Sequence, residues 1–400
     1  MRILNVIHSV NRVHGGPAEG LRQLIRANLE LGHRHEVVTL DTPGEPWLAD
    51  FPVPLHAVGP TYWNYGYTPR LAPWLRAHAR DFDAVIVHGL WQYQGLGTWR
   101  ALRALGIPYF VFCHGMLDPW FKREYPLKHL KKWLYWLGAE YRVLRDASAV
   151  LFTAEEESRL APQSFWLYKA RHAVVGYGLT LDDTALEATA EVFFDMYPQT
   201  RGKRLLLFLA RIHPKKGCDL LIDAFAQVAA LDPSLHLVMA GPDQVGWQRV
   251  LHTQAAKLGI AERITWCGML GGTLKWAAYR AAEVFVLPSH QENFGIAVAE
   301  ALALGVPVLI SDKVNIWREI VAADAGCADS DTLEGTLATL RRWLALSPDQ
   351  RTTMKVHAAA CYQNHFHMAA AARRLAETLA PHIQRVPAAA AVRLGLDSQP

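Results

Sequence analysis

The sequence lacks the features that mark secreted, zinc-binding and membrane-spanning proteins. Only five of its 400 residues are cysteines, and they lie far apart without a C-x-x-C pair, which argues against a disulfide framework and a zinc site. No apolar run approaches the roughly 20 residues of a membrane-spanning helix. The first residues, MRILNVIHSV, are too short and too polar to predict a signal peptide. These absences favour a chain that stays in a reducing cytoplasm.

A strong charge of one sign is also missing. The net charge is +4, and the basic residues are spread along the chain, so the total does not indicate a nucleic-acid partner. What the chain does have is length and apolar content, because 51% of its residues are hydrophobic and 20% are charged. This composition is enough for two domains with full cores.

Short β-branched or aromatic runs alternate with longer helical patterns, which is typical of parallel sheets covered by helices. The apolar residues in each run are continuous rather than alternating, as expected for strands that are buried on both faces. The first series lies at residues 3–7, 35–40, 83–89, 108–115, 148–153 and 172–178, and the second at residues 204–211, 235–241, 263–268, 283–289 and 306–312. The pattern predicts two α/β domains.

We predict an N-terminal domain at residues 1–178 and a C-terminal domain at residues 179–365. They are expected to join near Gly176-Tyr177-Gly178, where glycines permit the backbone turn of an interdomain crossing. Residues 366–380 are Ala-rich and predict a terminal helix that packs back on the N-terminal domain. Residues 381–400 are expected to form a disordered tail.

Ligand-binding residues are expected where parallel strands end. Gly15 and Gly16 follow the first strand and precede a helix, so backbone N–H groups there can approach an anion. A plain turn is the alternative. Arg211 and Lys216 follow the first strand of the second domain, and a guanidinium with an ammonium suits a diphosphate. A solvated loop with two ordinary cations is the alternative there.

The stretch SHQENFGIAVAEALALG at residues 289–305 carries two carboxylates eight residues apart, Glu292 and Glu300. If a helix starts near Gly295, at most ~12 Å of axial rise separates them, so they cannot bind one atom. Each carboxylate is suited to a pair of neighbouring hydroxyls. Small apolar residues around Glu300 predict a largely buried helix. The alternative is a helix-terminal charge at Glu292 and a surface residue at Glu300.

Together these residues resemble glycosyltransferase family 4, whose members are retaining enzymes of the GT-B architecture. In that α/β fold two Rossmann-like domains with parallel sheets face each other across a cleft. The resemblance covers about residues 1–380, and its most specific element is the E-x7-E motif, Glu292 and Glu300. The supporting residues are Gly15-Gly16, His114 in CHGMLDPW, Arg211 with Lys216, AGPD at 240–243 and ALALGVPVLISD at 301–312. The Pro-Asn-Gly that the family has at the interdomain crossing is replaced here by Gly176-Tyr177-Gly178.

The resemblance implies a nucleotide-diphosphate sugar as the donor substrate. Arg211 and Lys216 would neutralise its diphosphate, Glu300 would accept the ribose hydroxyls, and Glu292 would accept hydroxyls of the transferred sugar near His114. The implied catalytic residues are His114, Glu292, Arg211 and Lys216. The implied donor-binding residues are Gly15, Gly16, Arg211, Lys216, Glu292, Asn293, Phe294, Gly295 and Glu300.

The implied mechanism is a front-side displacement with retention at the anomeric carbon. The departing diphosphate takes the acceptor proton, so no carboxylate is assigned as a general base. No cofactor is expected. No metal is expected either, since Asp182-Asp183 and the DSD at 329–331 fall in apparent loops away from the phosphate-binding residues.

Residues 118–148 bear on the acceptor. Leu127, Leu130, Leu134, Leu137, Tyr141 and Leu144 repeat every three or four residues, which predicts that this face packs on the domain. The opposite side and the residues just before it would then present Trp120, Lys128, Lys131, Lys132 and Trp136. Lysines interleaved with aromatics suit an anionic membrane surface or the acceptor, and a solvated basic helix is the alternative.

The sequence therefore predicts an enzyme, a cytoplasmic hexosyltransferase at the inner face of the membrane, acting on a glycan or lipid-linked saccharide in surface polysaccharide or lipopolysaccharide synthesis. Alternatives are a transferase acting on a small soluble acceptor, a sugar-nucleotide epimerase of the same architecture, and a non-catalytic nucleotide-sugar-binding subunit. A glycosidase that uses the two glutamates as acid and base would leave the phosphate-binding residues without a role.

Overall fold

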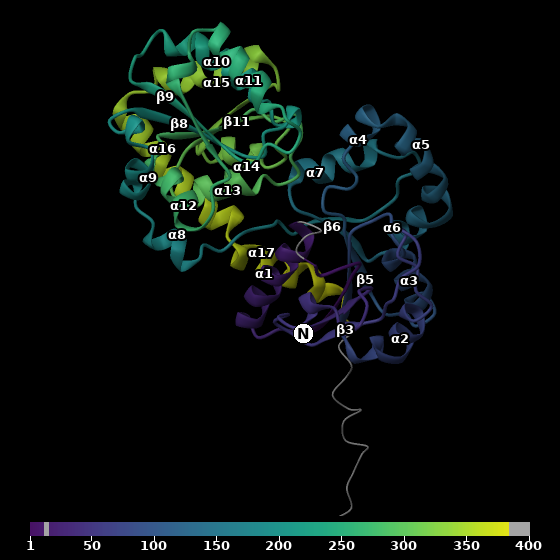
Figure 1. Cartoon of the computed structure of the whole chain (residues 1–400). Coiled ribbons are helices and arrows are strands. Elements are labelled where there is room, and N and C mark those ends of the chain that lie inside the picture. Colours follow the sequence, from purple (N-terminus) through teal and green to yellow (C-terminus); the bar gives the residue numbers. More distant parts are fainter. Residues whose placement is uncertain (12–15, 384–400) are drawn as a thin grey trace, which may run out of the picture.

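The computed structural model describes residues 1–11 and 16–383, which form two sheets with helices around them (Figure 1). The first sheet has seven parallel strands in the order β3-β2-β1-β4-β5-β6-β7. Its strands are β1 (Arg2–Ile7), β2 (Arg34–Thr39), β3 (Leu55–Ala57), β4 (Ala84–His88), β5 (Tyr109–Phe112), β6 (Ala149–Phe152) and β7 (His172–Val174).

The second sheet has six parallel strands in the order β10-β9-β8-β11-β12-β13. Its strands are β8 (Arg204–Leu209), β9 (Leu235–Ala240), β10 (Ile264–Gly268), β11 (Val284–Leu287), β12 (Val308–Ser311) and β13 (Gly326–Asp329). Both sheets therefore have the strand order of a Rossmann-type fold, in which connections run outward in two directions from the central pair of strands. The two predicted α/β domains of parallel sheets are confirmed.

Two short strands, β3 and β13, were not predicted from the sequence, and both lie at sheet edges. β3 has only three residues, all half-buried, and β13 reads GCAD, of which only the glycine is buried. Each pairs on one side only and is partly exposed, so neither carries the continuous run by which the other strands were predicted.

Helices cover both faces of each sheet. The first domain contains α1 (Gly16–Glu30), α2 (Leu71–His78), α3 (Tyr93–Leu102), α4 (Trp120–Glu124), α5 (Pro126–Tyr135), α6 (Tyr141–Asp146) and α7 (Glu155–Leu160). The later helices are α8 (Asp183–Glu187), α9 (Ala190–Met196), α10 (Cys218–Ala229), α11 (Gln248–Lys257), α12 (Gly272–Ala281), α13 (Ile296–Ala303), α14 (Trp317–Ala322), α15 (Leu333–Ala345), α16 (Pro348–Cys361) and α17 (Met368–Leu379).

The chain crosses between the domains twice, and the two crossings lie side by side. The Leu179 N–H donates to the carbonyl of Phe366 at 3.0 Å, and the Met368 N–H donates to the carbonyl of Leu179 at 3.2 Å. After the second crossing, α17 packs against α1, and its Leu375 and Leu379 are fully buried in the N-terminal core. The C-terminal segment therefore returns to the first domain (Figure 1). Of the predicted tail at residues 381–400, residues 384–400 lie outside the described part of the chain.

The prediction for residues 118–148 was wrong about which face is buried. Leu127, Leu130, Leu134 and Leu137 are exposed, whereas Trp136 is fully buried and stacks on Phe165 with ring centroids 4.7 Å apart. Burial of a large aromatic ring removes more apolar surface from water than burial of a leucine does, so the aromatic face packs against the core.

The segment is also not one helix. It breaks before Pro126, and residues 136–140 form a π-helical turn between α5 and α6. Such a turn inserts an extra residue and rotates the later positions, so Leu144 is buried although the earlier leucines are exposed.

Candidate functional site

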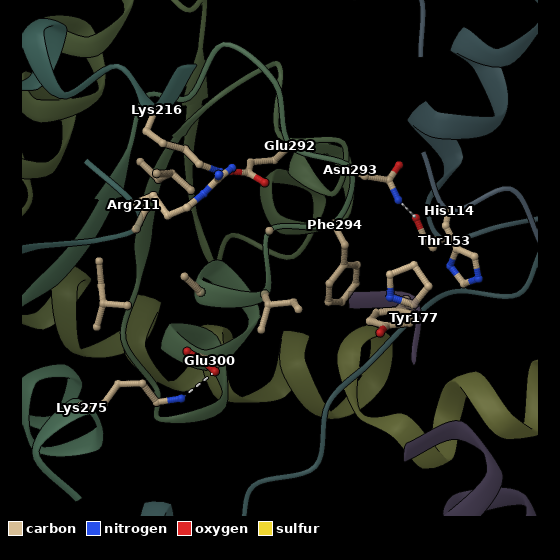
Figure 2. Close-up of a pocket in the computed structure, with 17 residues that line it drawn as sticks. His114, Thr153, Tyr177, Arg211, Lys216, Lys275, Glu292, Asn293, Phe294 and Glu300 are labelled. Atoms are coloured by element: carbon tan, nitrogen blue, oxygen red, sulfur yellow. Dashed lines mark hydrogen bonds and ion pairs between the residues drawn. The ribbon is translucent and has the colours of Figure 1, made fainter. Parts of the chain in front are cut away.

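A cavity of about 600 Å³ lies between the two domains, at the carboxyl ends of both sheets (Figure 2). Rossmann-type sheets bind ligands at this edge, beside the central strand pairs, here β1 with β4 and β8 with β11. The polar residues that line the cavity are His114, Thr153, Tyr177, Arg211, Lys216, Lys275, Glu292, Asn293 and Glu300. The structure thus brings together the predicted cations, both predicted carboxylates and the predicted histidine.

Lys216 and Glu292 form an ion pair that links the loops after β8 and β11. Lys216 is only 8% exposed. Burial, and then the neighbouring charges of Lys215 and Arg211, lower the pKa of Lys216 to about 7, whereas the pair with Glu292 favours the charged form. Arg211 reaches toward the pair from the end of β8 (Figure 2). Positive charge is thus concentrated at one end of the cavity, where an anionic group could replace the Glu292 carboxylate.

Glu300 lies inside α13, toward the other end of the cavity, and two residues of α12 hold its carboxylate. The Lys275 ammonium is 2.9 Å from Oε1 (Figure 2). The Tyr279 hydroxyl donates to Oε2 at 3.0 Å. Each oxygen keeps a lone pair for a further donor. Lys275 and Tyr279 were missed by the sequence analysis, because they stand in an ordinary amphipathic helix and only the tertiary structure brings them to Glu300.

The backbone between β11 and α13 fixes the direction of Glu292. Its N–H donates to the carbonyl of Lys313 at 2.9 Å, and its carbonyl accepts from the N–H of Asn315 at 3.0 Å. Gly295 then adopts a left-handed conformation with φ 74° and starts α13, whose first residues line the cavity. The free N–H groups of that first turn are a suitable place for an anion or a hydroxyl oxygen.

Asn293 and Phe294 connect this loop to the other domain. The amide of Asn293 donates to the Thr153 hydroxyl at 3.2 Å, and the ring of Phe294 meets that of Tyr177 edge-on with centroids 5.0 Å apart. Tyr177 belongs to the first interdomain crossing, so the crossing itself forms one wall of the cavity.

His114 is the half-buried outer member of a series of hydrogen-bonded side chains whose other members, His88 and Asn5, are buried in the N-terminal sheet. Its Nε2 lies 3.2 Å from Nδ1 of His88, whose Nε2 lies 3.1 Å from Oδ1 of Asn5. The amide nitrogen of Asn5 donates to the backbone carbonyl of Glu36 at 3.2 Å. Burial lowers the pKa of His114 to about 4 and that of His88 well below its usual value of 6.5, so both rings are neutral near pH 7.

We infer that the hydrogen bonds from Asn5 through His88 decide which ring nitrogen of His114 carries the proton. Because Asn5 turns its amide nitrogen to a carbonyl, its oxygen must accept from Nε2–H of His88. The neutral ring of His88 then has a bare Nδ1, which accepts from Nε2–H of His114. His114 is left with Nδ1 as a lone-pair acceptor, which suits a hydroxyl donor in the cavity that it lines.

The remaining predicted site residues lie elsewhere. Gly15 is outside the described residues, and Gly16 is the first residue of α1, next to Pro17, which lines the cavity. Trp120, Lys128, Lys131, Lys132 and Trp136 do not line it. Within residues 1–11 and 16–383, no group of three or more His, Cys, Asp and Glu side chains is placed to hold a metal ion. No helix in the described part of the chain is both long and apolar enough to span a bilayer.

The fold and the site define a two-domain protein with Rossmann-type sheets and a cleft that combines cations with hydroxyl-accepting carboxylates. Comparison with known proteins identifies its family. Residues 15–178 match the family described as glycosyl transferase 4-like domain, and residues 193–359 match glycosyl transferases group 1. The chain belongs to the family 4 glycosyltransferases, enzymes of the GT-B architecture.

One curated relative agrees with the family, and two solved structures agree with the fold. D-inositol 3-phosphate glycosyltransferase of Nocardia farcinica is 32% identical over 180 residues, 43% of this chain and 39% of that protein. The matched segment thus spans about two fifths of the relative's length. Sucrose-phosphate synthase of Thermosynechococcus elongatus superposes with a TM-score of 0.72 at 19% identity, covering 96% of this chain and 99% of the other. HepE of Anabaena, solved with UDP and glucose, gives 0.67 at 19% identity, covering 95% and 99%.

Proposed function

We propose that the protein transfers a hexosyl group from a nucleotide-diphosphate sugar to a saccharide acceptor, with retention at the anomeric carbon. The observation that carries the proposal is the division of the cavity between a cationic end, with Arg211 and Lys216, and the carboxylate of Glu300 held by α12. A diphosphate suits the first end, and a ribose diol suits the second. The transferred sugar would lie between Glu292 and His114.

In the proposed reaction the bond from the anomeric carbon to the diphosphate oxygen breaks as the bond to the acceptor oxygen forms on the same face. The acceptor proton passes to the departing diphosphate. Arg211, Lys216 and the N–H groups at the start of α13 stabilise the charge that builds on the leaving group. Glu292 and the acceptor nitrogen of His114 hold hydroxyls of the sugar, and we assign no general base, cofactor or metal.

A second cavity of about 510 Å³ in the N-terminal domain supports a saccharide as the acceptor. It adjoins the first, because Pro17 lines both and His88, in its wall, touches His114. None of the described residues that line it is an Asp, Glu, Lys or Arg. Its polar lining is His8, Ser9, Thr61, Trp63, Asn64, His88, Gln92 and Gln94.

Two of these residues suit a sugar ring. Trp63 is 81% exposed at the edge of the cavity, and Oε1 of Gln94 is buried without a hydrogen-bond partner among the described residues. A flat ring offers an apolar face, and an unused buried acceptor gains a bond when a hydroxyl reaches it. This lining favours an uncharged glycan or lipid-linked saccharide, as in surface polysaccharide or lipopolysaccharide synthesis, over a small phosphorylated acceptor. A lipid-linked acceptor would bring the enzyme to the inner membrane face.

The test measures binding and transfer separately. Calorimetry with ADP, GDP and UDP identifies the nucleotide, and a ligand at ~100 times its Kd should add about 2.7 kcal/mol of stability. Transfer from the matching nucleotide sugars is then assayed with neutral and phosphorylated saccharides, with and without EDTA. Replacing Arg211 and Lys216 together by alanine should abolish transfer without unfolding the protein. Product formation without any acceptor would identify an epimerase instead, and loss of activity in EDTA would refute the metal-free mechanism.

A further inference from the structure

Four leucines of α5 and the turn that follows it form an exposed apolar row. Leu127, Leu130, Leu134 and Leu137 are 79%, 65%, 79% and 48% exposed. They are spaced three, four and three residues apart, so they lie along one side of the helix. The other side is occupied, because His129 is buried and Trp133 packs on the N-terminal core. We call these four residues the leucine row.

Cations surround the leucine row. Residues 120–135 contain five of them, Lys122, Arg123, Lys128, Lys131 and Lys132, against the single carboxylate of Glu124, and this net charge of +4 equals that of the whole chain. Lys122, Arg123, Lys128 and Lys131 are exposed and form no ion pair with any described residue. Lys132 is turned inward, over the ring of Trp91.

We propose that the leucine row is a docking surface for an anionic lipid bilayer. A helix with leucines on one side and lysines beside them lies in the headgroup layer, where the leucines leave water and the ammonium groups meet lipid phosphates. A second copy of this chain is a poorer occupant, because a symmetric contact through the row would bring two segments of charge +4 together.

The position of the row fits this occupant. α4 directly precedes α5, and residues of α4 line a second opening between the domains, opposite His290 and Lys313 of the C-terminal domain. α4 and α5 lie together at one side of the N-terminal domain (Figure 1). A bilayer held against α5 would therefore keep the interdomain opening close to the lipid surface. The proposal does not depend on which donor or saccharide the cleft takes.

The experiment is co-sedimentation of the full chain with vesicles of phosphatidylcholine alone and with about 30% phosphatidylglycerol. The test variant is Leu127→Ser/Leu130→Ser/Leu134→Ser. The matched control is Leu186→Ser/Leu231→Ser/Leu258→Ser, three exposed leucines of the C-terminal domain. A charge variant, Lys128→Glu/Lys131→Glu, separates the electrostatic from the apolar part. Nucleoside diphosphate binding by each variant shows that the fold and the donor site are intact.

We expect the wild type and the control to bind the anionic vesicles, and the test variant to bind them roughly tenfold or more weakly. The charge variant should bind more weakly too, and 1 M salt should weaken wild-type binding, because the Debye length falls from about 10 Å at 0.1 M to about 3 Å. Equal binding by test and control variants, or by both vesicle types, overturns the proposal. So does a wild-type dimer in ultracentrifugation that the test variant abolishes without losing vesicle binding.

Discussion

Glu292 and Glu300 belong to one motif, but they have different neighbours. Removing the charge of each should therefore affect nucleotide binding and transfer differently. Glu300 is held by Lys275 and Tyr279 and is assigned to the ribose. Replacing it by Gln should weaken nucleoside diphosphate binding by about 1.5–3 kcal/mol, or roughly 10- to 150-fold, the value of a charge-assisted hydrogen bond. Glu334→Gln, at an exposed position of the same domain, is the control.

Glu292→Gln should behave in another way. It removes the carboxylate that competes with a diphosphate for Lys216, so affinity for the nucleoside diphosphate should stay the same or rise while kcat falls, because the sugar is held less well in the transition state. Calorimetry and steady-state kinetics separate the two variants. An equal loss of nucleotide affinity in both would contradict this division of the donor.

Lys216 should make nucleoside diphosphate binding depend on pH. Its pKa of about 7 in the free protein should rise when the diphosphate binds, so the complex takes up a proton above pH 7. Affinity should then fall as the pH rises, by at most about tenfold per pH unit. Calorimetry at pH 8.5 in buffers of different ionisation enthalpy measures the uptake. Lys216→Arg should remove it, because a guanidinium stays charged. If proton uptake on binding were unchanged in that variant, Lys216 would not be the group that takes up the proton.

His114 should act as a neutral acceptor. An asparagine places an oxygen near the position of Nδ1, so His114→Asn should keep at least tenfold more kcat than His114→Ala, an advantage of about 1.4 kcal/mol, the order of one hydrogen bond. The pKa of about 4 means that the contribution of the wild-type ring is present above pH 5 and is lost as the pH falls through 4. A kcat limb near pH 6.5 that disappears in the asparagine variant would contradict the neutral tautomer.

At the scale of elements, the loops that carry the site depend on close backbone approach. Gly217 follows Lys216, has φ 66°, and a Cβ there would collide with the carbonyl oxygen of Pro288 after β11. The loops that supply Lys216 and Glu292 are therefore packed against each other at a point that only glycine permits.

Gly217→Ala should consequently lower stability and weaken nucleoside diphosphate binding. Gly202 has φ 73° with no heavy atom within 4 Å of an added Cβ, so Gly202→Ala measures the cost of the left-handed backbone alone, about 1 kcal/mol. We expect the loss in Gly217→Ala to exceed that of the control by at least about 1 kcal/mol in chemical denaturation. Equal losses would show that the two loops are not tightly apposed.

At the scale of the whole molecule, polar contacts hold the domains together beside the site. Nε of Arg318 lies 2.6 Å from Oε2 of Glu156, and the amide of Gln291 donates to Asp118 at 2.9 Å. The first contact is partly exposed, and the second is buried. The Gln291 contact joins the loop that carries Glu292 to the domain that carries His114, and the Arg318 contact joins α14 to the same domain.

Arg318→Ala should therefore reduce kcat/KM for transfer severalfold while leaving nucleoside diphosphate affinity unchanged. Apart from the implied contribution of Gly15 and Gly16, the assigned diphosphate and ribose contacts come from the C-terminal domain, whereas sugar and acceptor positioning need both domains. Arg342→Ala, which breaks an ion pair within one domain, is the control. A parallel fall in nucleotide affinity would indicate that the N-terminal domain helps to bind the nucleotide.

The sequence by itself determined the two parallel sheets and the main charged residues of the site. Continuous apolar runs reveal strands that are buried on both faces, and the spacing of Glu292 and Glu300 is local to one loop and one helix. Arg211 and Lys216 follow one strand directly, so their side of the sheet was predictable.

Only the tertiary structure decided which distant residues complete the site. Lys275 reaches Glu300 from another helix, and Asn5 orients His114 through His88 from two other strands. No local pattern encodes such contacts. The leucine row is a second example. Its three- and four-residue spacing shows that the leucines share one face of the helix, but not whether that face points to the core or to solvent. The leucines face solvent because Trp136 is buried in the core instead, and burying the larger ring removes more apolar surface from water.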